Sequence, residues 1–335
     1  MKDKILITGA TGFVGSWMTK YLLEQGHKVK VLKRTNSDVS ELSGLDIEYC
    51  IGDVTDKNSI LAAASDVQSI FHLAGFVGYT KTARSLMEKV NVQGTKNIVQ
   101  VCTELKISRL LYFSSVTAIG AGLNNQQVLN EESEYNIDQL NLGYFQTKHA
   151  AEKIVMDACK KNEISAAIVN PSTIYGPGDA KKGSRKTQLK VARGEFPVYT
   201  SGGANIISIH DVTKAAYNAY LNSSNGERYI LAGENITIKQ LFEYIAECAG
   251  VEPPKIYLPN FVVFSLGQVG ELLEKFGKKG PLNSETAWTS TLFHWFDSSK
   301  AQRELGLKPK PAKDAICESV NWVKDNIFNQ LRSDG

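Results

Sequence analysis

The stretch Thr8-Gly9-Ala10-Thr11-Gly12-Phe13-Val14-Gly15 decides the fold of this chain. It follows the apolar run Ile5-Leu6-Ile7 and precedes residues 16–25, where apolar side chains recur at helical spacing. In such a strand–turn–helix unit, one glycine permits the tight turn, another lets the backbone approach a pyrophosphate, and the third lets the helix pack on the strand. Because the helix N-terminus would then face the anion, the stretch predicts a dinucleotide-binding site.

Short β-rich runs alternate with helical stretches through the first two-thirds of the chain. We expect strands at 5–7, 29–32, 47–51, 70–73, 110–113 and 166–169, and helices at about 16–25, 59–65, 86–105 and 144–161. Strands that alternate with helices pair in parallel through right-handed crossovers. The expected fold is therefore α/β, with a Rossmann-type doubly wound parallel sheet and a smaller, helix-rich C-terminal region. We place the dinucleotide-binding domain at 1–175, with sheet elements continuing to about 235, and a mainly substrate-binding region at 176–335.

The composition excludes several classes of protein. The chain has 335 residues, of which 42% are hydrophobic and 22% charged, as in ordinary globular proteins. A net charge of +3 is too balanced to indicate nucleic acid as a partner. No apolar run approaches the roughly 20 residues of a transmembrane segment, and the N-terminus lacks a signal-peptide pattern, so we expect a cytoplasmic protein. The five scattered cysteines, without CxxC spacing, indicate a reducing compartment.

The residues after the second expected strand indicate which dinucleotide binds. An acidic residue there would bond a ribose 2′-hydroxyl, whereas a cation would attract a 2′-phosphate. Lys33 and Arg34 occupy this place, and no acidic residue occurs before Asp38. Since an arginine can bind phosphate through two parallel hydrogen bonds, we predict NADP as the cofactor, with NAD as the alternative. Asp53, after the third strand, is either an acceptor for an adenine amino group or a turn former.

A tyrosine and a lysine four residues apart, Tyr144 and Lys148, share one face of an expected helix. A tyrosine has an ordinary pKa of about 10, which is too high for efficient acid–base catalysis near neutrality. A lysine cation nearby would favour the phenolate and lower that pKa. Ser115, at the end of the fifth expected strand, could bond a substrate carbonyl oxygen. Each signal is weak alone, because Tyr-x-x-x-Lys is common on amphipathic helices and a serine at a strand end often caps a turn.

Together these motifs resemble the extended short-chain dehydrogenase/reductase family, within the NAD-dependent epimerase/dehydratase superfamily, and its dihydroflavonol reductase-like or 3β-hydroxysteroid dehydrogenase-like branch. The resemblance covers nearly the whole chain. It rests on the glycine turn and on motifs in the family's order: Gly52-Asp53-Val54, His72-Leu73-Ala74-Gly75, Asn91-Val92-Gln93-Gly94-Thr95, Ser114-Ser115, Tyr144 to Lys148, and Asn170 to Gly178. The resemblance implies that Tyr144 is the general acid–base and that Lys148 lowers its pKa and binds the cofactor ribose. It also implies that Ser115 is the catalytic serine and Asn91 a structural, proton-relay residue.

The resemblance also implies the residues that contact the cofactor and leaves no role for a metal. They are Gly9, Thr11, Gly12, Phe13, Val14, Lys33, Arg34, Asp53, Val54, Leu73, Ala74, Gly75, Lys148, Pro171, Ser172 and Thr173. Phe76, Thr117 and Tyr175 are candidate substrate contacts. The apolar run 261–266 could line the same pocket, although the start of a packed helix is its simpler interpretation. Family members often dimerise through helices near 86–105 and 144–161, which allows a homodimer here.

Three functions stay open from the sequence. The first is an NADP(H)-dependent reductase of a ketone or aldehyde on a small apolar substrate, in which Tyr144 protonates the oxygen as hydride reaches the carbon. The second is a nucleotide-sugar epimerase or dehydratase with retained NAD. Such enzymes usually carry an arginine before a Phe-x-His-x-x-Asp segment, but Ala204 or Asn205 and Ser208 stand at those places. The third, a non-catalytic cofactor-sensing protein, is disfavoured because relatives of that kind often lose the tyrosine or the lysine.

Overall fold

The computed structural model describes residues 2–180, 185–276, 280 and 282–328. Its main sheet consists of β1 (Lys4–Thr8), β2 (Lys28–Lys33), β3 (Ile47–Ile51), β4 (Ser69–His72), β5 (Arg109–Phe113), β6 (Ala166–Pro171) and β10 (Arg228–Leu231). These seven strands lie in the order β10-β6-β5-β4-β1-β2-β3, and every neighbouring pair is parallel. The predicted doubly wound sheet is therefore confirmed. The chain reverses direction across the sheet between β1 and β4, which places a ligand crevice at the carboxyl ends of these strands.

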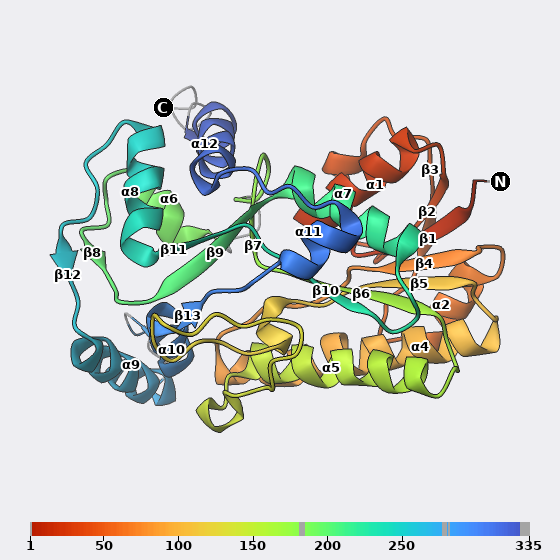
Figure 1. The fold of residues 1–335 in the computed structure, drawn as a ribbon, viewed down its shortest axis with the longest axis horizontal. Helices are drawn as coiled ribbons and strands as arrows, with labels where there is room; N and C mark the ends of the chain where they lie inside the picture. Colours follow the sequence, from red (N-terminus) through yellow and green to blue (C-terminus); the bar gives the residue numbers. More distant parts are fainter. Residues whose placement is uncertain (1, 181–184, 277–279, 281, 329–335) are drawn as a thin grey trace.

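Helices cover both faces of this sheet (Figure 1). One layer contains α2 (Lys57–Ala64), α4 (Gly94–Glu104) and α5 (Gly143–Lys160), and the other contains α1 (Phe13–Glu24), α7 (Ile209–Asn222) and α11 (Ser299–Leu305). Side chains alternate along β1, so Ile5 and Ile7 pack in the α1 and α7 layer, whereas Leu6 packs in the α2 and α4 layer. All three are fully buried. Because these strands are buried on both faces, their sequences are nearly continuous apolar runs.

A smaller lobe follows β6, although β10 and α7 return to the main sheet (Figure 1). Its strands are β7 (Thr173–Tyr175), β8 (Val198–Tyr199), β9 (Gly203–Ser208), β11 (Glu234–Thr237), β12 (Ile256–Tyr257) and β13 (Phe293–His294). Its helices are α6 (Lys186–Ala192), α8 (Ile238–Ala249), α9 (Asn260–Lys275), α10 (Ser284–Thr291) and α12 (Ala312–Val323). Thr237 caps α8 through a reciprocal capping box with Gln240. We call this lobe the cap.

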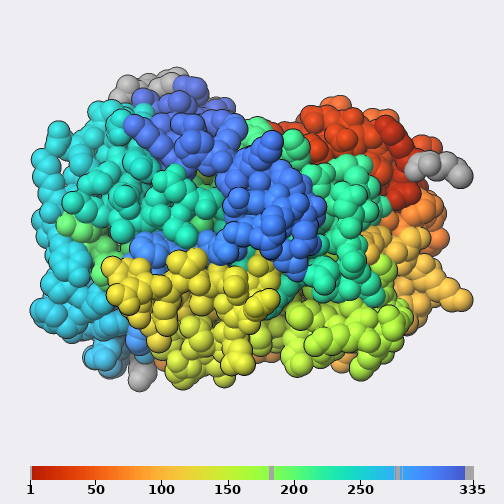
Figure 2. All heavy atoms as spheres, in the orientation of Figure 1, coloured from red at the N-terminus to blue at the C-terminus, as the bar shows by residue number. Residues whose placement is uncertain are grey.

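The two lobes join along one side of the crevice. The segment between β5 and α5 forms bridges from Gly122 to Phe293 and from Leu129 to Phe296, both in the cap. Figure 2 shows this segment, in yellow, packed beside the blue C-terminal part of the chain. The crevice therefore has one wall from the main sheet and one wall from the cap.

A disulfide joins Cys248 of α8 to Cys317 of α12. The sequence predicted reduced cysteines, and this pair corrects that expectation. The packing of α8 against α12 brings the two Cα atoms to 5.2 Å, which the scattered positions in the sequence do not reveal. Cys50, Cys102 and Cys159 are free, and the last two are buried among apolar residues.

The apolar run 261–266, the helix lengths and the outward faces of α4 and α5 each bear on a prediction made from the sequence. The run 261–266 starts α9 directly after Pro259, with Val263 buried and Phe261 72% exposed. None of the helices in the described ranges has the length and apolar character of a membrane span. The outward residues of α4 and α5, such as Lys96, Gln100 and Lys153, are polar, and a homodimer through these helices stays a prediction.

Candidate active site

The turn between β1 and α1 is tightly packed at Gly9 and Gly15 and has space at Gly12. Gly9 has a φ of +76°, and a Cβ there would lie 2.6 Å from the backbone nitrogen of Ala74. A Cβ on Gly15 would lie 2.1 Å from the carbonyl oxygen of Gly9, so packing requires both glycines. Gly12, the N-cap of α1, would meet only that carbonyl, at 3.2 Å, and no side chain caps the helix. This uncapped N-terminus fits a pyrophosphate.

A cavity of about 370 Å³ runs from this turn past the carboxyl ends of β2, β3 and β4. It brings together ten predicted cofactor residues: Gly9, Thr11, Gly12, Lys33, Arg34, Asp53, Val54, Leu73, Ala74 and Gly75. Arg34 is exposed and its guanidinium has no partner among the described residues. Asp53 accepts a hydrogen bond from the backbone of Thr55 at 2.8 Å, as a turn former does. Phe76, predicted to contact substrate, lines this cavity instead of the neighbouring one that contains Tyr144.

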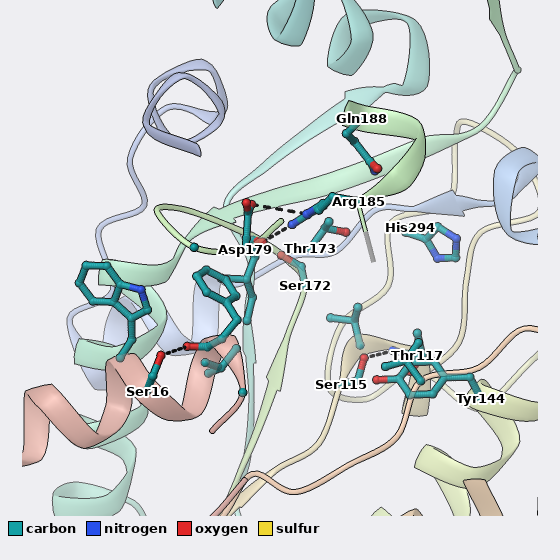
Figure 3. A pocket seen from close by; sticks show the side chains of 18 of the residues that line it. Ser16, Ser115, Thr117, Tyr144, Ser172, Thr173, Asp179, Arg185, Gln188 and His294 are labelled. Carbon is teal, nitrogen blue, oxygen red and sulfur yellow. Dashed lines mark hydrogen bonds and ion pairs between the residues drawn. The ribbon is translucent and has the colours of Figure 1, made fainter. Parts of the chain in front are cut away.

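That second cavity, of about 450 Å³, continues from the glycine turn to the cap. It brings together seven predicted residues besides the turn: Phe13, Val14, Ser115, Thr117, Tyr144, Ser172 and Thr173. Figure 3 shows Ser115, Thr117 and Tyr144 on one wall, with Gln188 and His294 of the cap facing them. Pro171 and Tyr175 are buried beside this cavity and do not line it; the Tyr175 ring packs 3.8 Å from the Arg185 guanidinium. We call this space the catalytic cavity.

Tyr144 lies in the first turn of α5 with its hydroxyl beside Ser115 (Figure 3). Ser115 precedes a short helical turn, and its Oγ accepts a hydrogen bond from the backbone of Thr117 at 3.2 Å. Burial raises the pKa of Tyr144 above its ordinary value, and the hydrogen bond with Ser115 opposes this rise. The expected lowering by Lys148 is therefore not found, because desolvation of the phenol dominates in the protein alone.

Lys148 lies one turn further along α5 and lines neither of the two cavities. Its side chain is 6% exposed, and its Nζ donates a hydrogen bond to the carbonyl oxygen of Phe113 at 2.9 Å. Burial lowers the pKa of Lys148 to about 8, against the attraction of Glu152. An ammonium has three donors, so two N–H groups remain for other acceptors.

Asn91 positions backbone rather than lining a cavity. Its Oδ1 accepts from the backbone N–H of Phe76 at 2.7 Å, and its Nδ2 donates to the Phe76 carbonyl at 3.0 Å and to Thr147 Oγ1 at 3.2 Å. It therefore ties the segment after β4 to α5. Asn91 lies in a π-helical turn, Glu88–Gln93, and such turns often occur at functional sites.

His72 is a buried residue of this network whose role the sequence did not indicate. Its ring bonds Thr8 Oγ1 at 2.7 Å through Nδ1 and Thr95 Oγ1 at 3.2 Å through Nε2. Thr95 in turn donates to the Asn91 carbonyl at 2.6 Å. Burial, together with the charge of Lys148, lowers the pKa of His72 to about 3. A neutral histidine thus links the glycine turn to Asn91, and only its place in the His72-Leu73-Ala74-Gly75 motif marked it.

Sequence reasoning also missed the cap wall of the catalytic cavity, which includes Arg185, Gln188, Thr289 and His294. Arg185 and Asp179 form a buried ion pair with a distance of 3.4 Å between Nε and Oδ2. Ser319 donates to the other carboxylate oxygen of Asp179 at 2.7 Å. The sequence also predicts an exposed basic loop at 181–186, of which residues 181–184 lie outside the described residues. No motif marked these residues, because the tertiary fold alone brings α6, α10 and β13 to the cavity.

The comparisons with known proteins agree with this geometry. The model of the NAD dependent epimerase/dehydratase family matches residues 5–232. A Synechocystis sp. protein, provisionally named a dihydroflavonol 4-reductase, is 31% identical and aligns over 98% of this chain and 96% of its own. Sterol demethylase protein B of Methylococcus capsulatus is 30% identical over 96% of this chain and 98% of its own.

Solved structures show the same fold. The crystal structure of gox2253 has a TM-score of 0.86 and 33% identity, with 97% of this chain and 99% of that chain covered. A UDP-glucose 4-epimerase of Thermus thermophilus in complex with NAD has a TM-score of 0.77 at 19% identity, over 97% of this chain and all of that chain. The family model covers most of the chain and includes the glycine turn, Ser115, Tyr144 and Lys148. The chain therefore belongs to the NAD dependent epimerase/dehydratase family, the extended short-chain dehydrogenases/reductases.

Proposed function

We propose that this protein is an NADP(H)-dependent reductase of ketones or aldehydes. The observation that carries the proposal is the catalytic cavity, which the glycine turn, Ser115 and Tyr144 line together. A dinucleotide whose pyrophosphate lay at the N-terminus of α1 would direct its nicotinamide towards Ser172 and Thr173. A carbonyl group between this position and Tyr144 would have an acid, a hydrogen-bond donor and a hydride source around it.

In this reaction Ser115, Tyr144 and Lys148 would each have a distinct role. Bound NADPH would supply the hydride. Ser115 Oγ donates a hydrogen bond to the carbonyl oxygen and steadies the negative charge that develops there. Tyr144 gives that oxygen its phenolic proton, and its raised pKa keeps it protonated at neutral pH. The two N–H groups of Lys148 that Phe113 leaves unused bind the nicotinamide ribose, as the family resemblance implies.

Arg34 and Lys33 support NADP rather than NAD. Both line the cavity past β2, and the Arg34 guanidinium has no partner among the described residues. A cation at this place fits the 2′-phosphate of NADP and offers nothing particular to the 2′-hydroxyl of NAD. The provisional name of one relative, a dihydroflavonol 4-reductase, adds support for a reductase.

The nucleotide-sugar epimerase or dehydratase is the alternative, and the geometry of β9 argues against it. Asn205 is fully buried and bonds Ser172, Asn235 and the Gly233 backbone, so its side chain serves the cap sheet. Ala204 is also buried, and Ser208 caps α7. A cation for a sugar pyrophosphate is therefore missing from this strand. A non-catalytic role is less well supported, because Tyr144 and Ser115 share one cavity.

The test is NADPH oxidation by the purified protein with a broad panel of aldehydes and ketones. We expect stoichiometric oxidation with at least one carbonyl compound, and its loss in Tyr144→Phe with NADPH affinity unchanged. Tyr135→Phe is the matched control, because this tyrosine lies outside both cavities of the site. Turnover of a nucleotide sugar by protein that retains NAD, without reduction of any panel member, would contradict the proposal.

A further inference from the structure

The cap wall of the catalytic cavity carries a histidine that the proposed reduction does not use. His294 lies in β13 and faces the cavity between Gln188 and Thr117 (Figure 3). Its Nε2 lies 3.2 Å from the carbonyl oxygen of Thr289. A carbonyl oxygen only accepts, so this nitrogen carries the ring proton and donates it. Burial also lowers the pKa of His294, which keeps the ring neutral.

The other ring nitrogen, Nδ1, is consequently an acceptor with an unshared electron pair. It has no hydrogen-bond partner among the described residues. The Thr117 hydroxyl, on the sheet side of the same cavity, is buried and also has no partner. Buried polar groups are nearly always hydrogen-bonded in native proteins, so the unpaired Thr117 hydroxyl points to a ligand in this cavity. The half-buried His294 lines the same cavity, where its Nδ1 offers that ligand an acceptor.

We propose that His294 Nδ1 selects substrates that carry a hydroxyl group away from the reacting carbonyl. A hydroxyl donates one hydrogen bond and accepts others, so it matches an acceptor at His294 and a donor at Thr117. The substrate class is thus a hydroxylated ketone or aldehyde, which is more polar than the small apolar substrate predicted from the sequence. This inference rests on the proposed function for the identity of the reacting group, but not for the acceptor at His294.

The expected size of the effect follows from the cost of an unsatisfied acceptor. A site built to bond a substrate hydroxyl rejects the analogue without it, because the buried partner is then left unpaired. The corresponding preference is about 10- to 100-fold in kcat/KM. This preference should depend only on the hydrogen-bond acceptor, so a side-chain amide carbonyl at position 294 should retain part of the preference.

The experiment compares ketones that differ by one hydroxyl group. The probes are acetone with hydroxyacetone, cyclohexanone with the hydroxycyclohexanones, and acetophenone with the hydroxyacetophenones. They are reduced by the natural protein and by His294→Phe and His294→Gln. The control variant is His27→Phe, since this buried histidine lies before β2 and bonds Tyr217, outside the cavity. NADPH affinity, measured for each variant, shows that the cofactor site is intact.

A second readout does not need turnover. Calorimetry measures how cyclohexanol and the cyclohexanediols bind to the protein saturated with NADP⁺. We expect the best diol to bind about 10-fold more tightly than cyclohexanol. His294→Phe should remove that difference, whereas His294→Gln and His27→Phe should retain it.

The outcomes separate the two proposals. A preference for the hydroxylated partner that His294→Phe abolishes and His294→Gln partly restores supports the inference. Reduction of the parent ketones with no such preference, or with a preference that His294→Phe leaves intact, overturns the inference and leaves the proposed function standing. If no ketone is reduced but diol binding depends on His294, the acceptor role is supported and the proposed function fails. If neither turnover nor diol binding depends on His294, the inference is overturned.

Discussion

The two walls of the catalytic cavity differ in how the chain builds them. The sheet wall comes from strand ends and from helices that directly follow them, so Gly12, Ser115 and Tyr144 each lie within a short sequence motif. The cap wall comes from α6, α10 and β13, which lie apart in the sequence and meet only through tertiary packing. The sheet wall carries the groups for a general reduction. The cap wall carries the groups that would distinguish one substrate from another.

The largest effect should come from Lys148→Met on the sheet wall. Loss of the cation should lower kcat/KM by roughly 1,000-fold, because two charge-assisted hydrogen bonds to the nicotinamide ribose would be lost. Because the folded pKa is lowered from 10.5 to about 8, burial of the cation costs stability at neutral pH. Lys148→Met should therefore raise the free energy of unfolding at pH 7, by up to about 3 kcal/mol. Kinetics and urea unfolding measure the two effects.

The pH dependence of kcat/KM and of stability in the natural protein is the control for Lys148→Met. Its kcat/KM should fall as pH rises through about 8, because Lys148 then loses its charge. Its stability should rise from about pH 8 towards 10.5, as the unfolded state binds the proton that the folded state releases. If Lys148→Met were both active and less stable than the natural protein, the assignment of Lys148 to the cofactor site would be wrong.

Gly9→Ala should have the next largest effect. The new Cβ would lie 2.6 Å from the Ala74 backbone at a φ of +76°, so the turn would have to move. We expect NADPH affinity to fall at least about 100-fold, because the backbone would no longer approach the pyrophosphate. Gly44→Ala is the matched control: its φ is +75°, with nothing within 4 Å of the new Cβ. It should cost about 1 kcal/mol of stability and leave NADPH affinity unchanged. Equal losses of affinity in the two variants would refute the role of Gly9.

Arg34→Asp should change the choice of cofactor while leaving the catalytic cavity intact. The ratio of NADP to NAD affinity should fall about 10- to 100-fold, the size of a lost charge-assisted hydrogen bond to phosphate. Lys160→Asp, an exposed charge reversal near the end of α5, is the control. Titration of both oxidised dinucleotides gives the ratio. An unchanged ratio in Arg34→Asp would leave the NADP assignment without support.

The smallest effect on activity should come from the cap disulfide. Cys248→Ala opens a link between residues 69 apart in the sequence, which should lower stability by about 2–4 kcal/mol. NADPH affinity should stay within about twofold, since neither cysteine lines a cavity of the site. Thermal unfolding with and without reductant measures this, with Cys102→Ala as a free-cysteine control. Insensitivity of the natural protein to reductant would refute the disulfide.

The difference between the walls also explains what the sequence could predict. Parallel strands buried on both faces leave apolar runs, and close packing at Gly9 and Gly15 leaves a glycine pattern, so the sheet and its turn were predictable. The expected helix 144–161 is α5, Gly143–Lys160. Predicting the pKa of Tyr144 failed because desolvation depends on neighbours from distant segments. The disulfide and His294 were missed for the same reason.

The most direct test of the central claim follows the hydride itself. NADPH that carries deuterium at both C4 hydrogens of the nicotinamide is incubated with the protein and a carbonyl substrate found in the panel. We expect one deuterium on the carbinol carbon of the product for each NADPH oxidised, and none with Tyr144→Phe. Deuterium that stays on a retained cofactor while a nucleotide sugar is epimerised or dehydrated would contradict the central claim.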